Sequence, residues 1–72
     1  MQLNGKRLFV MTTAQGTKTL KLFDLLGNQL MESTFEGTRA EIALERLPRR
    51  GTIIAKLTSN SKPLAVQTFK VK

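Results

Sequence analysis

Five carboxylates are the residues best suited to acid–base chemistry in this 72-residue chain. They are Asp24, Glu32, Glu36, Glu41 and Glu45. A glycosidase-type mechanism needs two such groups on either side of one substrate, and Glu41 and Glu45 are the candidates closest to that requirement. Both fall on the solvent face whether their segment is a helix or a strand, and no pocket-forming partner accompanies them. The carboxylates therefore predict no catalytic pair.

The sequence also lacks the residue types and motifs of other catalytic and metal-binding sites. The chain has no Cys and no His, which removes disulfides, thiolate chemistry and the commonest zinc ligands. No Ser occurs in a G-x-S-x-G setting, and no glycine loop matches a P-loop or a dinucleotide fingerprint. We therefore predict a protein that is not an enzyme, with no catalytic residue, no metal and no cofactor.

Basic residues dominate the charge, since 12 Lys and Arg stand against 5 acids and give a net charge of +7. Arg49 and Arg50 are adjacent on an expected turn, and Lys70 and Lys72 alternate with apolar residues on one face of the last expected strand. These four residues are candidate recognition residues. The plainer interpretations are a solvated surface for the arginines and, for the lysines, protection of an edge strand from aggregation.

The elements that position these residues are separated by five glycines, Gly5, Gly16, Gly27, Gly37 and Gly51. Turn signals every ~8–12 residues between β-rich runs are typical of a sandwich or a barrel. A sixth break lies at 59–63, where Asn, Ser and Pro favour a turn. The spacing therefore predicts an all-β domain.

The runs between these breaks have the alternation of strands. We predict strands over 6–13, 18–24, 28–35, 52–58 and 64–71. Residues expected to share a face are Leu8 with Val10, Leu20 with Leu22, and Ile53 with Ala55 and Leu57. The last run begins with Leu64 and Val66 but ends with Phe69 and Val71, and this change of phase predicts a bulge.

Periodicity alone leaves the segment 38–47 open between helix and strand. Thr38 and Glu41 match a capping box, and the residues that follow have helical spacing. A strand fits equally well, because Ala40, Ile42 and Leu44 alternate with polar or small residues, and a helix would leave Ile42 off its apolar face.

Four residues are expected to define turns. The Asp24 carboxylate can accept hydrogen bonds from nearby backbone amides, and Gly27 relieves strain in the same tight turn. Pro48 fixes its own φ and ends whichever element precedes it. Gly51 can adopt a positive φ before the next strand. For all four, a structural role is the primary interpretation.

The order of these motifs resembles a known family. Residues 18–28 form a strand followed by D-x-x-G, residues 44–51 read L-x-x-L-P-x-x-G, and residues 53–57 form a hydrophobic strand. Residues 69–72 belong to a separate last strand that follows a polar turn and ends in lysine. In this order, over residues 18–72, the motifs resemble the C-terminal sorting domain of proteins exported by the bacterial type IX secretion system.

The resemblance implies an immunoglobulin-like β-sandwich of about seven strands at the C-terminus of a larger cargo protein. In that family, the export machinery recognises the domain in the periplasm and passes the cargo across the outer membrane. A sortase-like enzyme often then removes the domain and attaches the cargo to a surface lipid. The resemblance also implies a strand over 39–44 and a turn over 47–51.

We therefore predict a small immunoglobulin-like antiparallel β-sandwich of six to seven strands. Residues 1–72 would form one domain, the C-terminal module of a longer protein. Its expected function is that of a sorting signal for export, with cleavage and surface anchoring to follow. The expected partners are the outer-membrane export machinery and a sortase-like processing enzyme. The domain would be a monomer that does not itself insert into a membrane. It would pass through the periplasm to the cell surface or the extracellular space, or stay in the cytoplasm if the 72 residues are the complete gene product.

Two alternative functions remain. A small basic β-barrel that binds nucleic acid would account for the charge, but single-strand binders stack bases on exposed aromatics, and each of the four Phe fits a core position. Nucleic acid is therefore the less favoured partner. A structural or carbohydrate-binding sandwich attached to an extracellular enzyme is the other alternative, although the Trp and Tyr of sugar platforms are absent.

Overall fold

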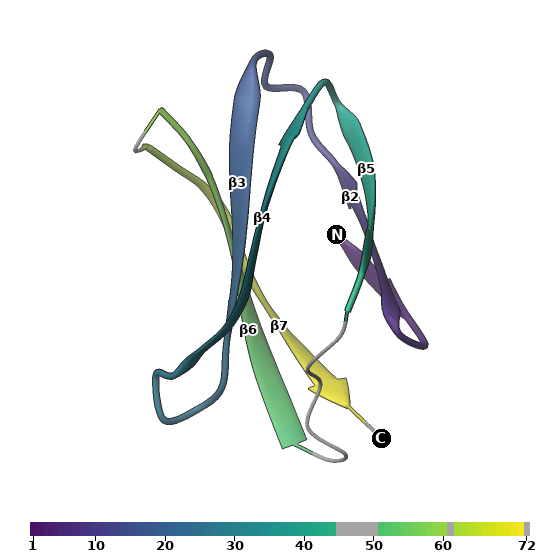
Figure 1. The fold of residues 1–72 in the computed structure, drawn as a ribbon, viewed down its shortest axis with the longest axis vertical. Coiled ribbons are helices and arrows are strands. Elements are labelled where there is room, and N and C mark those ends of the chain that lie inside the picture. Colours follow the sequence, from purple (N-terminus) through teal and green to yellow (C-terminus); the bar gives the residue numbers. More distant parts are fainter. Residues whose placement is uncertain (45–50, 61, 72) are drawn as a thin grey trace.

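Seven antiparallel strands in two sheets make up the part of the chain that the computed structural model describes, which is residues 1–44, 51–60 and 62–71 (Figure 1). The strands are β1 (Gln2–Asn4), β2 (Arg7–Met11), β3 (Thr17–Phe23), β4 (Gln29–Glu36), β5 (Arg39–Ala43), β6 (Gly51–Ser59) and β7 (Lys62–Val71). No helix occurs in these residues. The predicted all-β sandwich is confirmed, and in the described part of the segment that periodicity left open, residues 39–43 form a strand.

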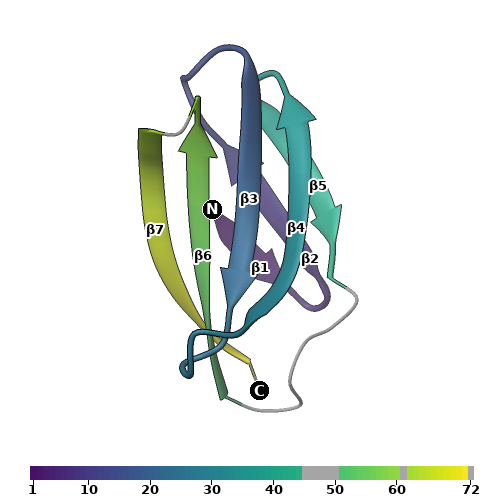
Figure 2. The ribbon, with the colours of Figure 1, turned by 60° about the vertical axis from the view of Figure 1, so that its left-hand side comes forward.

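The strand order places β1-β2-β5 in one sheet and β4-β3-β6-β7 in the other (Figure 2). The two sheets do not close into a barrel. In the constant-type immunoglobulin arrangement the fourth strand joins the sheet of the first, second and fifth strands. Here β4 forms a hairpin with β3 instead, so the second sheet has four strands and the first only three.

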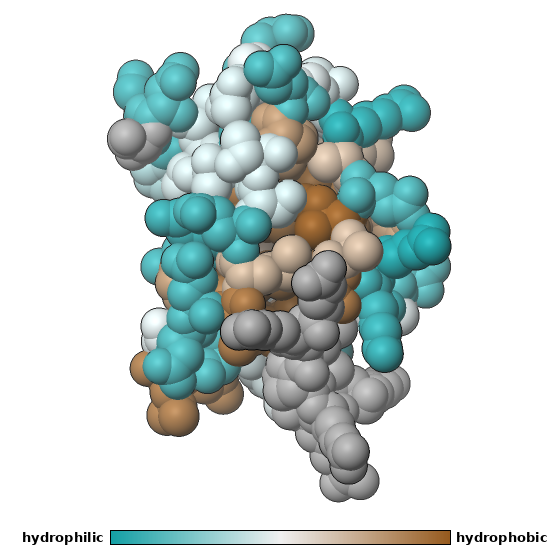
Figure 3. Space-filling model, viewed as in Figure 1, coloured by the Kyte–Doolittle hydropathy of each residue, from teal (hydrophilic) through white to brown (hydrophobic). Residues whose placement is uncertain are grey.

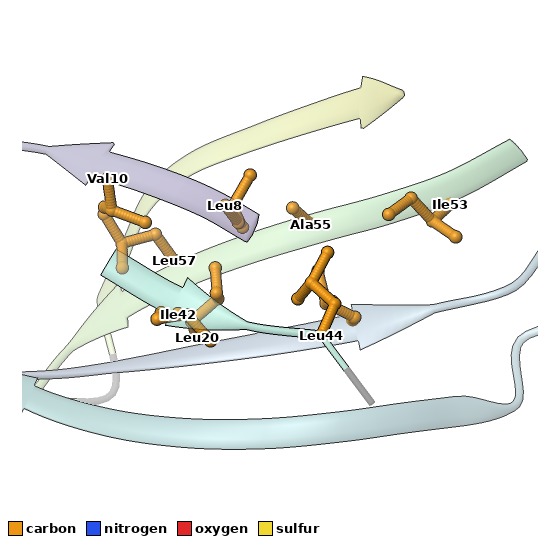
Figure 4. Close-up of a cluster of buried hydrophobic side chains, with 9 residues drawn as sticks. Leu8, Val10, Leu20, Ile42, Leu44, Ile53, Ala55 and Leu57 are labelled. Atoms are coloured by element: carbon orange, nitrogen blue, oxygen red, sulfur yellow. The ribbon is translucent and has the colours of Figure 1, made fainter. Parts of the chain in front are cut away.

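The core lies between the sheets and is built from alternate residues of β2, β3, β5 and β6, together with Leu44, which follows β5 (Figure 4). Its buried members are Leu8, Val10, Leu20, Leu22, Ile42, Leu44, Ile53, Ala55 and Leu57. All of the face-sharing residues predicted from the alternation are in this set. Ile42 explains why a strand forms over 39–43, because the extended backbone buries this residue while its neighbours Glu41 and Ala43 stay exposed.

Two features of the strands differ from the prediction. The first strand, β1, was missed because its three residues contain only one apolar side chain, Leu3. The bulge in β7 lies at its start, where the register with β6 shifts between Leu57 and Thr58, and not in its middle. From Ala65 onwards the pairing is continuous, so Val66 faces outward and is 61% exposed.

Candidate functional site

The turn between β3 and β4 is built around the Asp24 side chain. Its Oδ1 accepts hydrogen bonds from the backbone N–H groups of Leu26 and Asn28, both at 2.9 Å, and its Oδ2 accepts one from Asn28 Nδ2 at 3.1 Å. The Gly27 N–H donates to the Asp24 carbonyl oxygen at 3.1 Å. Gly27 has φ of 90°, a conformation that costs little without a Cβ. Asp24 and Gly27 therefore have the turn-defining roles that the sequence predicted.

These hydrogen bonds also act on the ionisation of Asp24. The side-chain hydrogen bond from Asn28 is the largest effect, and together with the backbone N–H donors it lowers the pKa of the carboxyl group below its ordinary value. Donors that point at a carboxylate favour its charged form. The turn is therefore held by an ionised Asp24 at neutral pH.

Two leucines stand at the tip of this turn, and sequence reasoning did not single them out. Leu25 is 68% exposed and Leu26 is 88% exposed. Figure 3 shows hydrophobic surface at the lower left, where Figure 1 places the β3–β4 turn. The signal in the sequence was a pair of large apolar residues inside a D-x-x-G turn, a position where burial is not available.

Three of the predicted site residues and motifs come together at one end of the sandwich. β3 ends where β6 begins and β7 finishes, since Phe23 pairs with Ile54 and Thr52 pairs with Lys70. The β3–β4 turn, Gly51 and the end of β7 therefore share the lower end of the molecule in Figures 1 and 2. We call this the recognition end. Gly51 opens β6 with φ of 124°, which agrees with its predicted role.

Lys70 is exposed near the end of β7, which is an edge strand of the four-stranded sheet. It lies opposite Thr52, whereas Phe69 lies opposite the buried Ile53, so lysine and phenylalanine point to opposite faces as the alternation predicts. The other predicted residues of this group, Pro48, Arg49, Arg50 and Lys72, lie outside the described residues.

The described carboxylates are spread over the surface. Glu41 Oε1 accepts a hydrogen bond from Arg7 Nη1 at 2.8 Å, and Glu32 lies 3.6 Å from Lys21 Nζ. Glu36 accepts a hydrogen bond from the Thr17 hydroxyl at 3.3 Å. Within residues 1–44, 51–60 and 62–71, no group of three or more acidic side chains could hold a metal ion. Glu45 lies outside these residues.

Lys18 is the buried charge that sequence reasoning missed. It is fully buried, and its ammonium group donates to the carbonyl oxygens of Ala14 at 2.9 Å and Gly16 at 2.5 Å. Its Nζ also lies 5.6 Å from the centre of the Phe35 ring. Its position in the strand alternation could have indicated this burial, since Lys18 shares the inward face of β3 with Leu20 and Leu22. This lysine fixes the connection between β2 and β3.

The four phenylalanines do not all take the core positions expected of them. Phe9 faces outward from β2 and is 37% exposed, because Leu8 and Val10 take the inward face. Phe23, Phe35 and Phe69 are partly buried.

No described residues form a helix long and apolar enough to cross a membrane.

Comparisons of the chain with protein-family models, with curated proteins and with solved structures gave no match.

Proposed function

We propose that this chain is a recognition module without catalytic activity, and that it acts as the C-terminal sorting domain of a protein exported by the type IX secretion system. In this role, export machinery in the outer membrane binds the domain, and a sortase-like enzyme can then cleave it and anchor the cargo at the cell surface. The order of motifs in residues 18–72 is the basis for naming this family.

The observation that carries the proposal is the meeting of separate motifs at the recognition end. The D-x-x-G turn, Gly51 and Lys70 are far apart in sequence but lie at the same end of the sandwich. The turn is held rigid by the Asp24 hydrogen bonds and displays two exposed leucines. A preformed apolar turn at the same end of the sandwich as Lys70 offers a partner a surface that needs little ordering on binding.

Export of a fusion tests this function. Residues 1–72 are placed after a secreted reporter in a bacterium that has the type IX machinery, and the reporter is measured in the periplasm and outside the cell. We expect export of the fusion, and loss of most export in a host without the machinery. Retention in the periplasm of a host that exports its own cargo would refute the sorting function.

A matched pair of lysines on β7 tests the site. Lys70 lies at the recognition end and Lys62 at the other end of the same strand, and both are exposed. We expect Lys70→Glu to reduce export strongly and Lys62→Glu to leave it nearly unchanged. Equal effects of the two substitutions would show that net charge, and not the recognition end, is what the machinery reads.

A second candidate function is binding of nucleic acid on the outer face of the four-stranded sheet. Lys21 and Lys56 lie directly opposite each other on β3 and β6, and like charges in this position destabilise a sheet. Lys56 Nζ lies 5.1 Å from the centre of the Phe23 ring. This candidate predicts salt-dependent binding of oligonucleotides, and a titration at low and at physiological salt that shows no binding would exclude it.

A further inference from the structure

Two leucines of the β3–β4 turn project from the body of the domain. Leu26 is the most exposed large apolar residue of the described chain, at 88%, and its neighbour Leu25 is 68% exposed. Figure 1 places this turn at the lower left and the three-stranded sheet at the right, so the turn projects from the four-stranded sheet on the side away from the core. Figure 3 shows the hydrophobic surface that results. An exposed apolar pair of this kind is a candidate for contact with a partner or a membrane.

The backbone of this turn is already hydrogen-bonded within the turn itself. The Leu26 N–H and the Asn28 N–H donate to Asp24 Oδ1. The Gly27 N–H donates to the Asp24 carbonyl oxygen. Three consecutive backbone donors therefore need no water, and the turn avoids the cost of moving an unpaired donor into an apolar environment. The Asp24 carboxylate accepts three hydrogen bonds and is directed at the turn.

Two lysines on the outer face of the four-stranded sheet supply positive charge near this end. Lys56 is exposed and alternates with the buried Ala55 and Leu57, so it points outward. Lys70 is exposed and lies opposite Thr52 on the same face. Neither of the two ion pairs between described residues includes Lys56 or Lys70. Both can therefore contact an anionic partner.

The spacing along the strands sets the depth of these lysines relative to the turn. Phe23 ends β3 directly before the turn and lies opposite Ile54, and Ile54 lies opposite Thr68. Lys56 is two residues further from the turn than Ile54, about 7 Å at the usual rise per residue. Lys70 is two residues beyond Thr68 in the other direction, towards the level of the turn. The headgroup layer of a bilayer is about 5–7 Å thick on each side. Leucines at the boundary with the acyl chains would thus place both lysines among the headgroups or within a Debye length of about 8 Å from them.

An anionic lipid surface uses both the leucines and the lysines. The boundary between headgroups and acyl chains accepts apolar side chains, and anionic headgroups attract lysines near the surface. A nucleic acid would contact the lysines but would leave the leucines in water. A second copy of the chain would bring another net charge of +7, which opposes self-association.

We propose that the β3–β4 turn and the outer face of the four-stranded sheet bind the surface of an anionic lipid bilayer. Leu25 and Leu26 enter the boundary between headgroups and acyl chains, and Lys56 and Lys70 contact the anionic headgroups. The contact is peripheral and revises the expectation that the domain does not itself insert into a membrane. It shares the turn with the recognition end but does not rest on the sorting function.

Co-sedimentation with lipid vesicles tests the contact on the purified 72-residue chain. The vesicles contain either phosphatidylcholine alone or phosphatidylcholine with about one third phosphatidylglycerol, a content that gives a negative surface potential. We expect the chain to bind the anionic vesicles about tenfold more tightly than the neutral ones, and to bind them less tightly at physiological than at low salt.

A single fluorophore measures the depth of the turn. The chain has no Trp or Tyr, so Leu26→Trp places the only strong fluorophore at the turn. We expect its emission to shift to shorter wavelength with anionic vesicles, and to be quenched by lipids that carry bromine on their acyl chains. A surface contact through the lysines alone would give neither change.

Matched variants separate the two parts of the contact. We expect the double change Leu25→Ser and Leu26→Ser to weaken binding to anionic vesicles about tenfold. Met11→Ser is its control, because Met11 is 70% exposed but lies on the outer face of the other sheet. Lys56→Glu should weaken binding about tenfold, whereas Lys62→Glu, at the other end of β7, should leave it nearly unchanged. The amide spectrum of each ¹⁵N-labelled variant shows whether it is folded.

Several results would overturn the proposal. They are equal binding to neutral and anionic vesicles, no loss of binding in the double leucine variant, no change in the emission of Leu26→Trp, or equal effects of Lys56→Glu and Lys62→Glu. Binding of an oligonucleotide without binding of vesicles would assign the outer face to nucleic acid instead. The assay contains no export machinery, so its failure leaves the sorting function standing, and failure of export leaves the lipid contact standing.

Discussion

Replacement of Lys18 by methionine tests whether the buried ammonium group stabilises the sandwich. Methionine keeps an unbranched stem of similar length, so Lys18→Met removes the charge and its hydrogen bonds while it preserves most of the packing. The two bonds, to Ala14 and Gly16, are the interactions lost. The carbonyl oxygens that accept them then lose their donor.

The magnitude follows from two opposing terms. Each hydrogen bond from a charged donor contributes about 1.5–3 kcal/mol, and removing an ammonium group from water costs several kcal/mol. The terms largely cancel, but the carbonyl oxygens left without a donor cost about 1–3 kcal/mol each unless water reaches them. We expect Lys18→Met to lower the free energy of unfolding by about 1–3 kcal/mol. In a domain of this size, each kcal/mol lowers Tm by about 4–8 °C.

Far-UV circular dichroism during heating is the appropriate assay, because the chain has no Trp or Tyr for fluorescence. Hydrogen exchange of the amides of residues 12–17 reports the connection between β2 and β3, and we expect it to become faster in Lys18→Met. Lys56→Met is the matched control, since Lys56 is exposed but also lies against a phenylalanine ring. It should change stability by no more than about 0.5 kcal/mol.

A Lys18→Met chain as stable as the Lys56→Met chain would refute a stabilising role of the ammonium group. This role would also be refuted if exchange in residues 12–17 did not change. In either case the aliphatic stem, and not the ammonium group, would hold Lys18 in the core.

Three further predictions concern the turn and the core. The pKa of Asp24 is lowered in the folded state, so ionised Asp24 stabilises the fold fully above about pH 4, the ordinary pKa of Asp. This stabilisation is lost as pH falls through the lower pKa of the folded state. Between about pH 2 and 6, Tm should therefore fall less with decreasing pH in Asp24→Ala than in the original chain. Gly27→Ala places a Cβ at φ of 90° and should cost about 1–2 kcal/mol in urea unfolding. Leu20→Ala should cost about 2–5 kcal/mol because Leu20 is fully buried; the same unfolding assay should give about 0.5 kcal/mol for the exposed Val66→Ala, and equal costs would contradict the assignment of the core.

Much of the fold could be predicted because burial on one face imposes alternation. Leu8, Val10, Leu20 and Leu22 showed this alternation directly, and the five glycines marked the turns. The segment around Ile42 could not be assigned from periodicity, because its apolar residues fit both a helix and a strand. Packing against the other strands of the core decided between them, which is a tertiary effect that local patterns do not contain.

The candidate site was harder to predict, since it depends on which strand ends meet. The Asp24 turn could be predicted from D-x-x-G, but its position at the same end of the sandwich as Lys70 depends on the pairing of β3 with β6 and of β6 with β7. Lys18 was missed because lysine is rarely buried, even though its phase on β3 was inward. Phe9 was assigned to the core because its side chain is apolar, although the alternation of β2 places it on the outward face.

The pairing of distant strands also has a consequence for how fast the chain can fold. Arg7 of β2 and Glu41 of β5 meet across 34 residues, and Thr19 of β3 and Thr58 of β6 across 39. Neither pair can form until a long intervening loop has closed, and topologies of this kind fold in milliseconds to seconds instead of microseconds. A newly made chain would therefore spend a measurable time with its apolar residues unprotected, an interval in which a chaperone could bind it before the sandwich closes.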